Sequence, residues 1–192
     1  MRKLIITTMA LFVSSLIYAT DVVVYPRLTG YPYPTPVSKT GQIISYATED
    51  DGWNSTNRGV AWPIPRFTVQ ANTNCVMDNL TGLMWARDAN IFGQTNWVGA
   101  VANCAGLNYG DFTDWRLPNL YEMQSIVAPN NNAPSLPTGH PFNNVEYNFY
   151  WTSTNRGGSG DFPFWQNFFW GQSAQQDKNN TTGYVWPVRG GY

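Results

Sequence analysis

Four short phrases, each of which places tryptophan or leucine beside a turn-forming residue, constrain the fold of this chain most strongly. They occur in the order Asp78-Asn-Leu-Thr-Gly-Leu-Met-Trp85, Asp114-Trp-Arg-Leu-Pro-Asn119, Tyr150-Trp-Thr-Ser-Thr154 and Tyr184-Val-Trp-Pro-Val-Arg-Gly-Gly191. This pattern is typical of a loop-rich domain that fixes short elements around one core. None of the phrases contains a nucleophile beside a base, a phosphate-binding loop or a set of metal ligands. The pattern therefore favours a fold used for binding.

The order and wording of these phrases resemble the C-terminal domain of the Legionella collagen-like adhesin family, which occurs in secreted bacterial proteins. The resemblance runs from about Pro65 to Gly191, and segments 39–48 and 62–67 resemble a lead-in common in such proteins. It implies an α+β, C-type-lectin-like domain over residues 65–192, with two short helices, short antiparallel strands and long loops. The family's namesake is an adhesin for sulfated polysaccharides, and a shared fold does not fix the ligand.

The first 19 residues have the pattern of a secretory signal peptide. Met1-Arg-Lys3 is a short basic region, Leu4–Tyr18 is an apolar run, and Ala19 is the expected cleavage position. The run is shorter than the ~20 residues that span a bilayer. We therefore expect a protein that is secreted, periplasmic or at the cell surface, with no membrane insertion after cleavage.

Residues 20–64 are rich in proline and glycine and are predicted to be an N-terminal extension. Tyr31-Pro-Tyr-Pro-Thr-Pro36 favours an extended, polyproline-like strap over a helix. Gln42–Ala47 could form one short strand. We expect the extension to lie over the domain or to lead into it.

The charge of the chain argues against nucleic acid as a partner. Eleven basic residues less Arg2 and Lys3 of the signal peptide leave nine, against twelve acidic residues, a formal charge of −3. Nucleic-acid-binding proteins carry a basic stripe, and none is present here. The same deficit weakens a direct transfer of sulfated-polysaccharide binding. A polysaccharide or a surface protein remains the expected partner.

Cys75 and Cys104 are the only two cysteines. An even count in an oxidising compartment favours a disulfide, which would close a loop of about 30 residues. The alternatives are two buried thiols or an intermolecular bridge.

The first predicted helix begins at a cap provided by Thr95 or Asn96 and ends at Gly106–Gly110. Its apolar residues recur at helical spacing: Trp97, Val101, Cys104 and Leu107.

The second predicted helix begins after Pro118, where Asn119 and Glu122 form a capping-box pattern. It ends before Pro129, and its apolar face contains Leu120, Met123, Ile126 and Val127.

Short strands account for most of the remaining elements, and Thr81-Gly82 is predicted to be a tight turn between the first two. The expected strands are Cys75–Asp78, Leu83–Arg87, Phe149–Ser153, Phe164–Trp170 and Gly183–Arg189.

The segment from Asp161 to Asn180 is the best candidate for a binding surface because aromatic residues precede an almost wholly polar stretch. Amide side chains hydrogen-bond sugar hydroxyls, while an aromatic ring packs on the face of a sugar. The alternative is a solvated hairpin tip over a buried aromatic strand. The candidate ligand-binding residues are Trp165, Asn167, Trp170, Gln172, Gln175, Asp177, Asn179 and Asn180.

A second group of residues is expected to be structural. Arg116 lies in an apolar phrase, so it should be partly buried and paired with a carboxylate or with backbone carbonyls. The full structural group is Trp85, Trp115, Arg116, Asn119, Trp151 and Arg189.

Catalysis and metal binding have little support in the residues. His140, the single histidine, lies in a turn-rich loop without a pairing motif, so a surface or loop-packing role is expected. Oxygen ligands for a structural calcium ion are available, but no Asp-x-Asp-x-Asp-Gly loop is present. We therefore expect no metal site and no cofactor, with structural calcium as the open alternative. Its ligands would come from Asp111, Asp114, Glu122, Asp161 and Asp177.

The sequence as a whole predicts a secreted, non-catalytic binding module that recognises carbohydrate or another cell-surface ligand in the manner of an adhesin. The alternatives are a protein-binding display domain, with late loops diversified by a retroelement, or a structural subunit of an envelope assembly.

Overall fold

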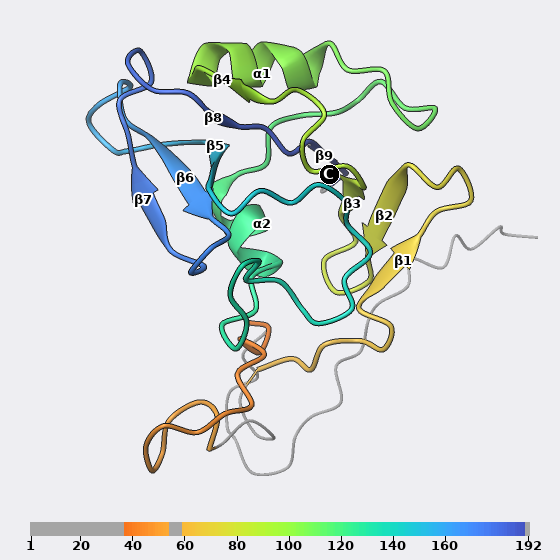
Figure 1. Ribbon diagram of the computed structural model, residues 1–192, viewed down its shortest axis with the longest axis vertical. Helices are drawn as coiled ribbons and strands as arrows, with labels where there is room; N and C mark the ends of the chain where they lie inside the picture. Colours follow the sequence, from red (N-terminus) through yellow and green to blue (C-terminus); the bar gives the residue numbers. More distant parts are fainter. Residues whose placement is uncertain (1–36, 54–58, 191–192) are drawn as a thin grey trace, which may run out of the picture. The chain divides into compact units, whose positions relative to one another are not determined.

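The computed structural model describes residues 37–53 and 59–190, which belong to a compact unit running from Thr35 to Tyr192 (Figure 1). The expected signal peptide and the Tyr31–Pro36 strap lie outside the described residues. Within them the chain forms two short helices and two sheets, an α+β arrangement with mostly antiparallel strands.

The first sheet has four antiparallel strands in the order β1-β2-β3-β9. Its centre is the expected hairpin, in which Val76 pairs with Trp85 and Gly82 turns the chain with a φ of 71°. The bounds are β1 Phe67–Val69, β2 Cys75–Asp78, β3 Met84–Ala86 and β9 Val188–Arg189.

The second sheet has five strands in the order β4-β8-β5-β6-β7. Its β5–β8 pair is parallel, with Tyr150 opposite Tyr184, so the expectation of antiparallel strands throughout is wrong at this point. The bounds are β4 Gln94–Thr95, β5 Phe149–Asn155, β6 Pro163–Asn167, β7 Ser173–Gln175 and β8 Gly183–Tyr184.

Three expected strands differ from the observed ones. The segment 164–170 leaves the sheet after Asn167, where a turn begins. The segment 183–189 is divided into β8 and β9 because the chain crosses between the two sheets at Val185-Trp186-Pro187. Gln42–Ala47 forms no strand.

Both expected helices are present. Helix α1 is Trp97–Ala105, and the Asn96 side chain caps it by accepting a hydrogen bond from the Gly99 N–H. Helix α2 is Leu120–Ser125 and starts with the predicted capping box between Asn119 and Glu122. None of the helices in the described ranges is long and apolar enough to cross a membrane.

Strand β5 separates two clusters of buried side chains, because successive residues of a strand point to opposite faces. Tyr150 belongs to the larger cluster, which also contains Met123 of α2 and Trp85 of the first sheet. Trp151 belongs to the smaller cluster beside α1, which contains Ala100 and Cys104. The predicted inward face of α1 was wrong at one position, since Val101 is exposed and Ala100 is buried in its place.

The predicted disulfide is not formed, and both cysteines are buried free thiols. Cys75 lies on β2 in the larger cluster, whereas Cys104 lies on α1 in the smaller cluster. The two cysteines therefore pack in two different clusters, and each occupies its position as a buried apolar side chain and not as half of a disulfide.

We expect these thiols to be unreactive until the protein unfolds. Burial raises the pKa of Cys104 to about 12 and also raises the pKa of Cys75, so little thiolate is available for attack. Titration with a thiol-reactive disulfide reagent should detect both groups only in denaturant, and a reducing agent should leave the melting temperature unchanged. A melting temperature that falls on reduction would contradict the free-thiol assignment.

Candidate ligand-binding surface

The turn between β6 and β7 presents Trp170 to solvent, with 66% of its surface exposed. The Asn167 side chain shapes this turn, because its Oδ1 accepts hydrogen bonds from the backbone N–H groups of Phe169 (2.7 Å) and Trp170 (3.3 Å). The Trp170 ring also packs edge-on against Phe169, with ring centroids 4.5 Å apart. These contacts hold the exposed Trp170 ring in one position.

A buried amide ties both ends of the same turn together. The Gln166 side chain is fully buried, and its Nε2 donates to the backbone carbonyls of Asn167 (3.1 Å) and Gln172 (3.2 Å). Its Oε1 accepts a hydrogen bond of 2.5 Å from Ser173 Oγ. Satisfied buried polar groups of this kind make a local structure rigid.

The turn also docks on the loop that follows α2. The N–H groups of Ala133 and Ser135 donate to the carbonyls of Phe169 (3.1 Å) and Phe168 (2.8 Å). Gly171 has a φ of 74°, and a Cβ at this position would lie 2.9 Å from Val127 Cγ1. Glycine is therefore required here both by backbone conformation and by the close approach of the loop.

Trp165 does not share this surface. Trp165 lies opposite Trp151 in the β5–β6 pair and packs on the smaller cluster, with its ring centroid 5.4 Å from that of Phe149. The structure thus assigns Trp165 to the framework beside α1, on the opposite face of the sheet from Gln166.

The late loop, residues 176–182, lies at the other end of the β6–β7 hairpin from Trp170. The N–H groups of Gln176 and Lys178 donate to the carbonyls of Pro163 and Asp161. These two hydrogen bonds continue the β6–β7 pairing in the direction away from the turn. Eight residues separate position 170 from position 178, up to roughly 25 Å of extended chain. The expected single surface from Asp161 to Asn180 is therefore two separate regions.

The polar groups of the late loop bond to one another. Asp177 accepts hydrogen bonds from the Asn179 N–H and from Asn180 Nδ2, both at 2.8 Å. These contacts, led by the backbone bond from Asn179, lower the pKa of Asp177. Of the eight candidate residues, Trp170 and Gln172 lie exposed in or beside the turn, with Asn167 as its brace, and Gln175 is exposed at the C-terminal end of β7.

Two of the acidic residues considered as calcium ligands form ion pairs. Asp114 pairs with Arg189 at 2.6 Å, and Asp161 pairs with Lys178 at 3.1 Å. Among residues 37–53 and 59–190, no group of three or more His, Cys, Asp or Glu side chains could hold a metal ion.

The structural group forms the framework around the two clusters. Trp85, Trp115 and Trp151 are buried. Arg116 makes a bidentate pair with Glu122 (2.6 and 2.8 Å) and donates to the Gly190 carbonyl at 2.9 Å. The guanidinium therefore joins the start of α2 to the C-terminal end of β9.

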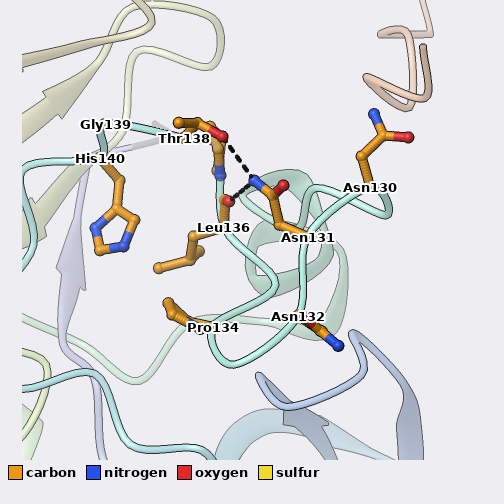
Figure 2. Close-up of a pocket in the computed structure, with 9 residues that line it drawn as sticks. Asn130, Asn131, Asn132, Pro134, Leu136, Thr138, Gly139 and His140 are labelled. Carbon is orange, nitrogen blue, oxygen red and sulfur yellow. Dashed lines mark hydrogen bonds between the residues drawn. The ribbon is translucent and has the colours of Figure 1, made fainter. Parts of the chain in front are cut away.

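Sequence reasoning missed a shallow hollow of about 290 Å³ in the loop after α2 (Figure 2). Asn131 crosses it and donates to the Leu136 carbonyl (2.6 Å) and to Thr138 Oγ1 (3.1 Å). His140 stacks on Phe142 at 5.9 Å, and burial lowers its pKa, so the imidazole is neutral at pH 7. The sequence signal for this hollow is the Asn130-Asn-Asn132 run, which directly follows Pro129 and, in the sequence, indicates only the end of the second helix.

Asn130, at the edge of this hollow, holds the segment that precedes the domain. Its Nδ2 donates to the Gly41 carbonyl at 2.6 Å, and its Oδ1 accepts from the Ile43 N–H at 3.3 Å. Figure 2 shows this side chain pointing away from His140 toward that segment. Both polar ends of the amide are thus occupied by the chain itself.

These features define an α+β domain in which the four ordered phrases build the framework and the intervening turns carry the exposed polar and aromatic groups. The chain belongs to the Lcl C-terminal domain family, whose model matches residues 74–189, more than half of its length. This match confirms the resemblance to the collagen-like adhesin family and identifies an adhesin-like domain. No curated protein matches the chain.

Proposed function

We propose that this chain is a secreted, non-catalytic binding module that recognises carbohydrate at an extracellular or cell-surface location, through the turn that carries Trp170. Family membership supports an adhesin-like role. The proposal includes a C-type-lectin-like fold, cleavage after Ala19, and presentation of the domain behind the N-terminal extension of residues 20–64.

The observation that carries this proposal is the rigid exposure of the Trp170 ring. An indole stabilises a protein most when it is buried. An exposed indole on a turn that Asn167 and Gln166 hold in place adds little to the core, and its ring is available to pack on a ligand. Two exposed amides follow Trp170 in the chain, Gln172 beside the turn and Gln175 at the C-terminal end of β7. Amides offer both a donor and an acceptor to sugar hydroxyls.

Trp170→Ala should reduce glycan binding by at least about tenfold while leaving the fold intact, because surface substitutions usually change stability by less than ~0.5 kcal/mol. Binding is measured on an array of neutral and sulfated glycans with the mature chain, and folding by thermal melting.

Trp53→Ala is the matched control for this experiment, since Trp53 is also exposed (60%) but lies in the segment before the domain. It should leave binding unchanged. Equal binding by the Trp170 variant and the wild type would contradict the proposal.

The second candidate function is a protein-binding display domain, and the exposed polar late loop favours it. Residues 176–182 join β7 to β8, and Gln176, Asn179 and Asn180 within them are exposed. Substitutions in such a loop cost the framework little. This function would be supported if the chain bound no glycan on the array and bound a protein ligand whose binding was lost when residues of this loop were substituted.

A further inference from the structure

Helix α2 lies beside the β6–β7 turn (Figure 1), and two contacts fix its direction relative to β7. Just beyond the C-terminal end of the helix, Val127 approaches Gly171 so closely that a Cβ on Gly171 would lie 2.9 Å from Val127 Cγ1. Further toward the N-terminus, Gln124 Nε2 donates to Ser173 Oγ at 3.0 Å. Along the turn and strand the contact positions advance from 171 to 173. Their partners fall from 127, just after the helix, to 124 within it, so β7 runs antiparallel to α2.

Because β7 runs antiparallel to α2, side chains beyond the Gln124–Ser173 contact on the two elements lie toward one another. Ser173 and Gln175 share one face of β7, because side chains two apart in a strand point the same way. Tyr121 and Gln124 share one face of α2, because residues three apart in a helix are neighbours. The Gln175 end of β7 therefore lies toward Tyr121, and the Trp170 turn lies toward the opposite end of the helix.

Both ends of the resulting surface carry an exposed ring. Tyr121 is 78% exposed and Trp170 is 66% exposed. The exposed amides of Gln124 and Gln175 share this side of the two elements. We call these four residues, Tyr121, Gln124, Trp170 and Gln175, the α2–β7 strip. Tyr121 and Val127, the residue that meets Gly171 beside Trp170, are six residues apart, roughly 9 Å at the ~1.5 Å rise of a helix, which is longer than a single pyranose ring.

The strip contains no ionised side chain. The acidic residue of α2, Glu122, points to another face of the helix, where it pairs with Arg116 and accepts from the Asn119 N–H. Lys178 and Asp161 pair with each other at the far end of the hairpin. An uncharged surface of amides and rings complements an uncharged ligand, because a sulfate or carboxylate would be desolvated here without a partner.

We propose that the α2–β7 strip binds a linear, uncharged oligosaccharide of several units, with Trp170 and Tyr121 stacking on sugars at opposite ends and Gln124 and Gln175 bonding the sugar hydroxyls. This inference rests on the proposed carbohydrate function and specifies its ligand class and its second ring. The site is extended because its two rings come from different elements, joined through the Gln124–Ser173 hydrogen bond.

The test measures affinity by calorimetry for two neutral ladders, cello-oligosaccharides and N-acetylated chito-oligosaccharides of one to six units, with sulfated dextran as the charged probe. For the mature wild-type chain, affinity for at least one neutral ladder should rise by tenfold or more between one unit and four. Tyr121→Ala should abolish this rise and leave the affinity for the shortest ligands unchanged. Trp170→Ala should weaken binding at every length.

Tyr46→Ala is the control, because Tyr46 has the same exposed fraction of 78% but lies in the segment before the domain. An affinity that does not depend on length, or a Tyr121 variant that keeps the rise, would overturn the extended site and leave the proposed function standing. Binding of sulfated dextran alone would overturn the uncharged ligand class. Failure of every glycan would overturn the carbohydrate function as well.

Discussion

Replacement of Asp78 by alanine is expected to lower the free energy of unfolding by about 3–5 kcal/mol, because it leaves a buried guanidinium without its counter-charge. Arg66 and Asp78 have side chains that are 7% and 0% exposed. Their contact is bidentate, with Arg66 Nε 2.7 Å from Oδ1 and Nη2 2.9 Å from Oδ2. A native domain has only about 5–15 kcal/mol of stability, so the loss is a large fraction of the total.

The pair is costly to break because each partner has further contacts. Asp78 also accepts hydrogen bonds from the Leu80 N–H (2.9 Å) and from Thr81 Oγ1 (2.7 Å), which form the β2–β3 turn. Arg66 Nη2 also donates to the Ser125 carbonyl at the end of α2, at 2.9 Å. Loss of the carboxylate therefore loosens the hairpin and its attachment to the helix together.

Asp114→Ala provides the matched control for Asp78→Ala. Asp114 also makes a bidentate pair with an arginine, Arg189, but its side chain is 43% exposed. Exposed pairs contribute about 0–1 kcal/mol. Urea denaturation of the two variants isolates the effect of burial, and similar losses for both would contradict the role given to Arg66–Asp78.

The Asp114–Arg189 pair also predicts a contribution to folding stability that is lost in acid. The hydrogen bond from Arg189 lowers the pKa of Asp114 in the folded state. Stability from this pair is therefore present above the unfolded pKa of about 3.9 and is lost as the pH falls through the lower folded value.

Local signals made much of the fold predictable. The capping box of Asn119 and Glu122 is encoded within four residues, and the hairpin at Thr81-Gly82 requires only a turn between two short strands. Both were found as expected. Arrangements that depend on distant parts of the chain were not predictable in this way. Whether residues 183–189 form one strand or two depends on pairing with β3, about a hundred residues earlier.

The candidate site shows the same division between local and distant information. Trp170 stood out because aromatic residues cluster around it in the sequence. Tyr121 and Gln124 gave no signal, because Gln124 meets Ser173 across a separation of 49 residues. Conversely, Asp177 seemed to belong with Trp170 through closeness in sequence, and the β6–β7 ladder places them at opposite ends of one hairpin.

Trp186→Ala is expected to have an effect as large as that of Asp78→Ala, about 3–5 kcal/mol, because the change opens a cavity in the larger cluster. Trp186 is fully buried in the crossing between β8 and β9. Its ring lies 4.9 Å from Phe142, 5.4 Å from Phe168, 5.6 Å from Tyr150 and 5.7 Å from Trp85, measured between centroids. These partners come from both sheets and from the loops between them.

The indole also has a polar role that separates it from a ring of similar shape. Trp186 Nε1 donates to the Ala86 carbonyl at 2.8 Å, inside the core. Trp186→Phe keeps an aromatic ring but leaves that carbonyl without this donor, an unmade buried bond that costs about 1–3 kcal/mol. The expected order of unfolding free energies is therefore wild type, then the phenylalanine variant, then the alanine variant.

Trp170→Ala is the natural comparison for Trp186→Ala, because the two tryptophans lie 16 positions apart in the same part of the chain and differ in burial. The Trp170 variant should unfold at nearly the wild-type urea concentration and lose glycan binding, whereas the Trp186 variant should unfold early. A variant at 186 that melts like the wild type would show that the four surrounding rings can close the cavity. In that case the two sheets would be held together by their hydrogen bonds and the remaining aromatic contacts, without Trp186 as their common centre.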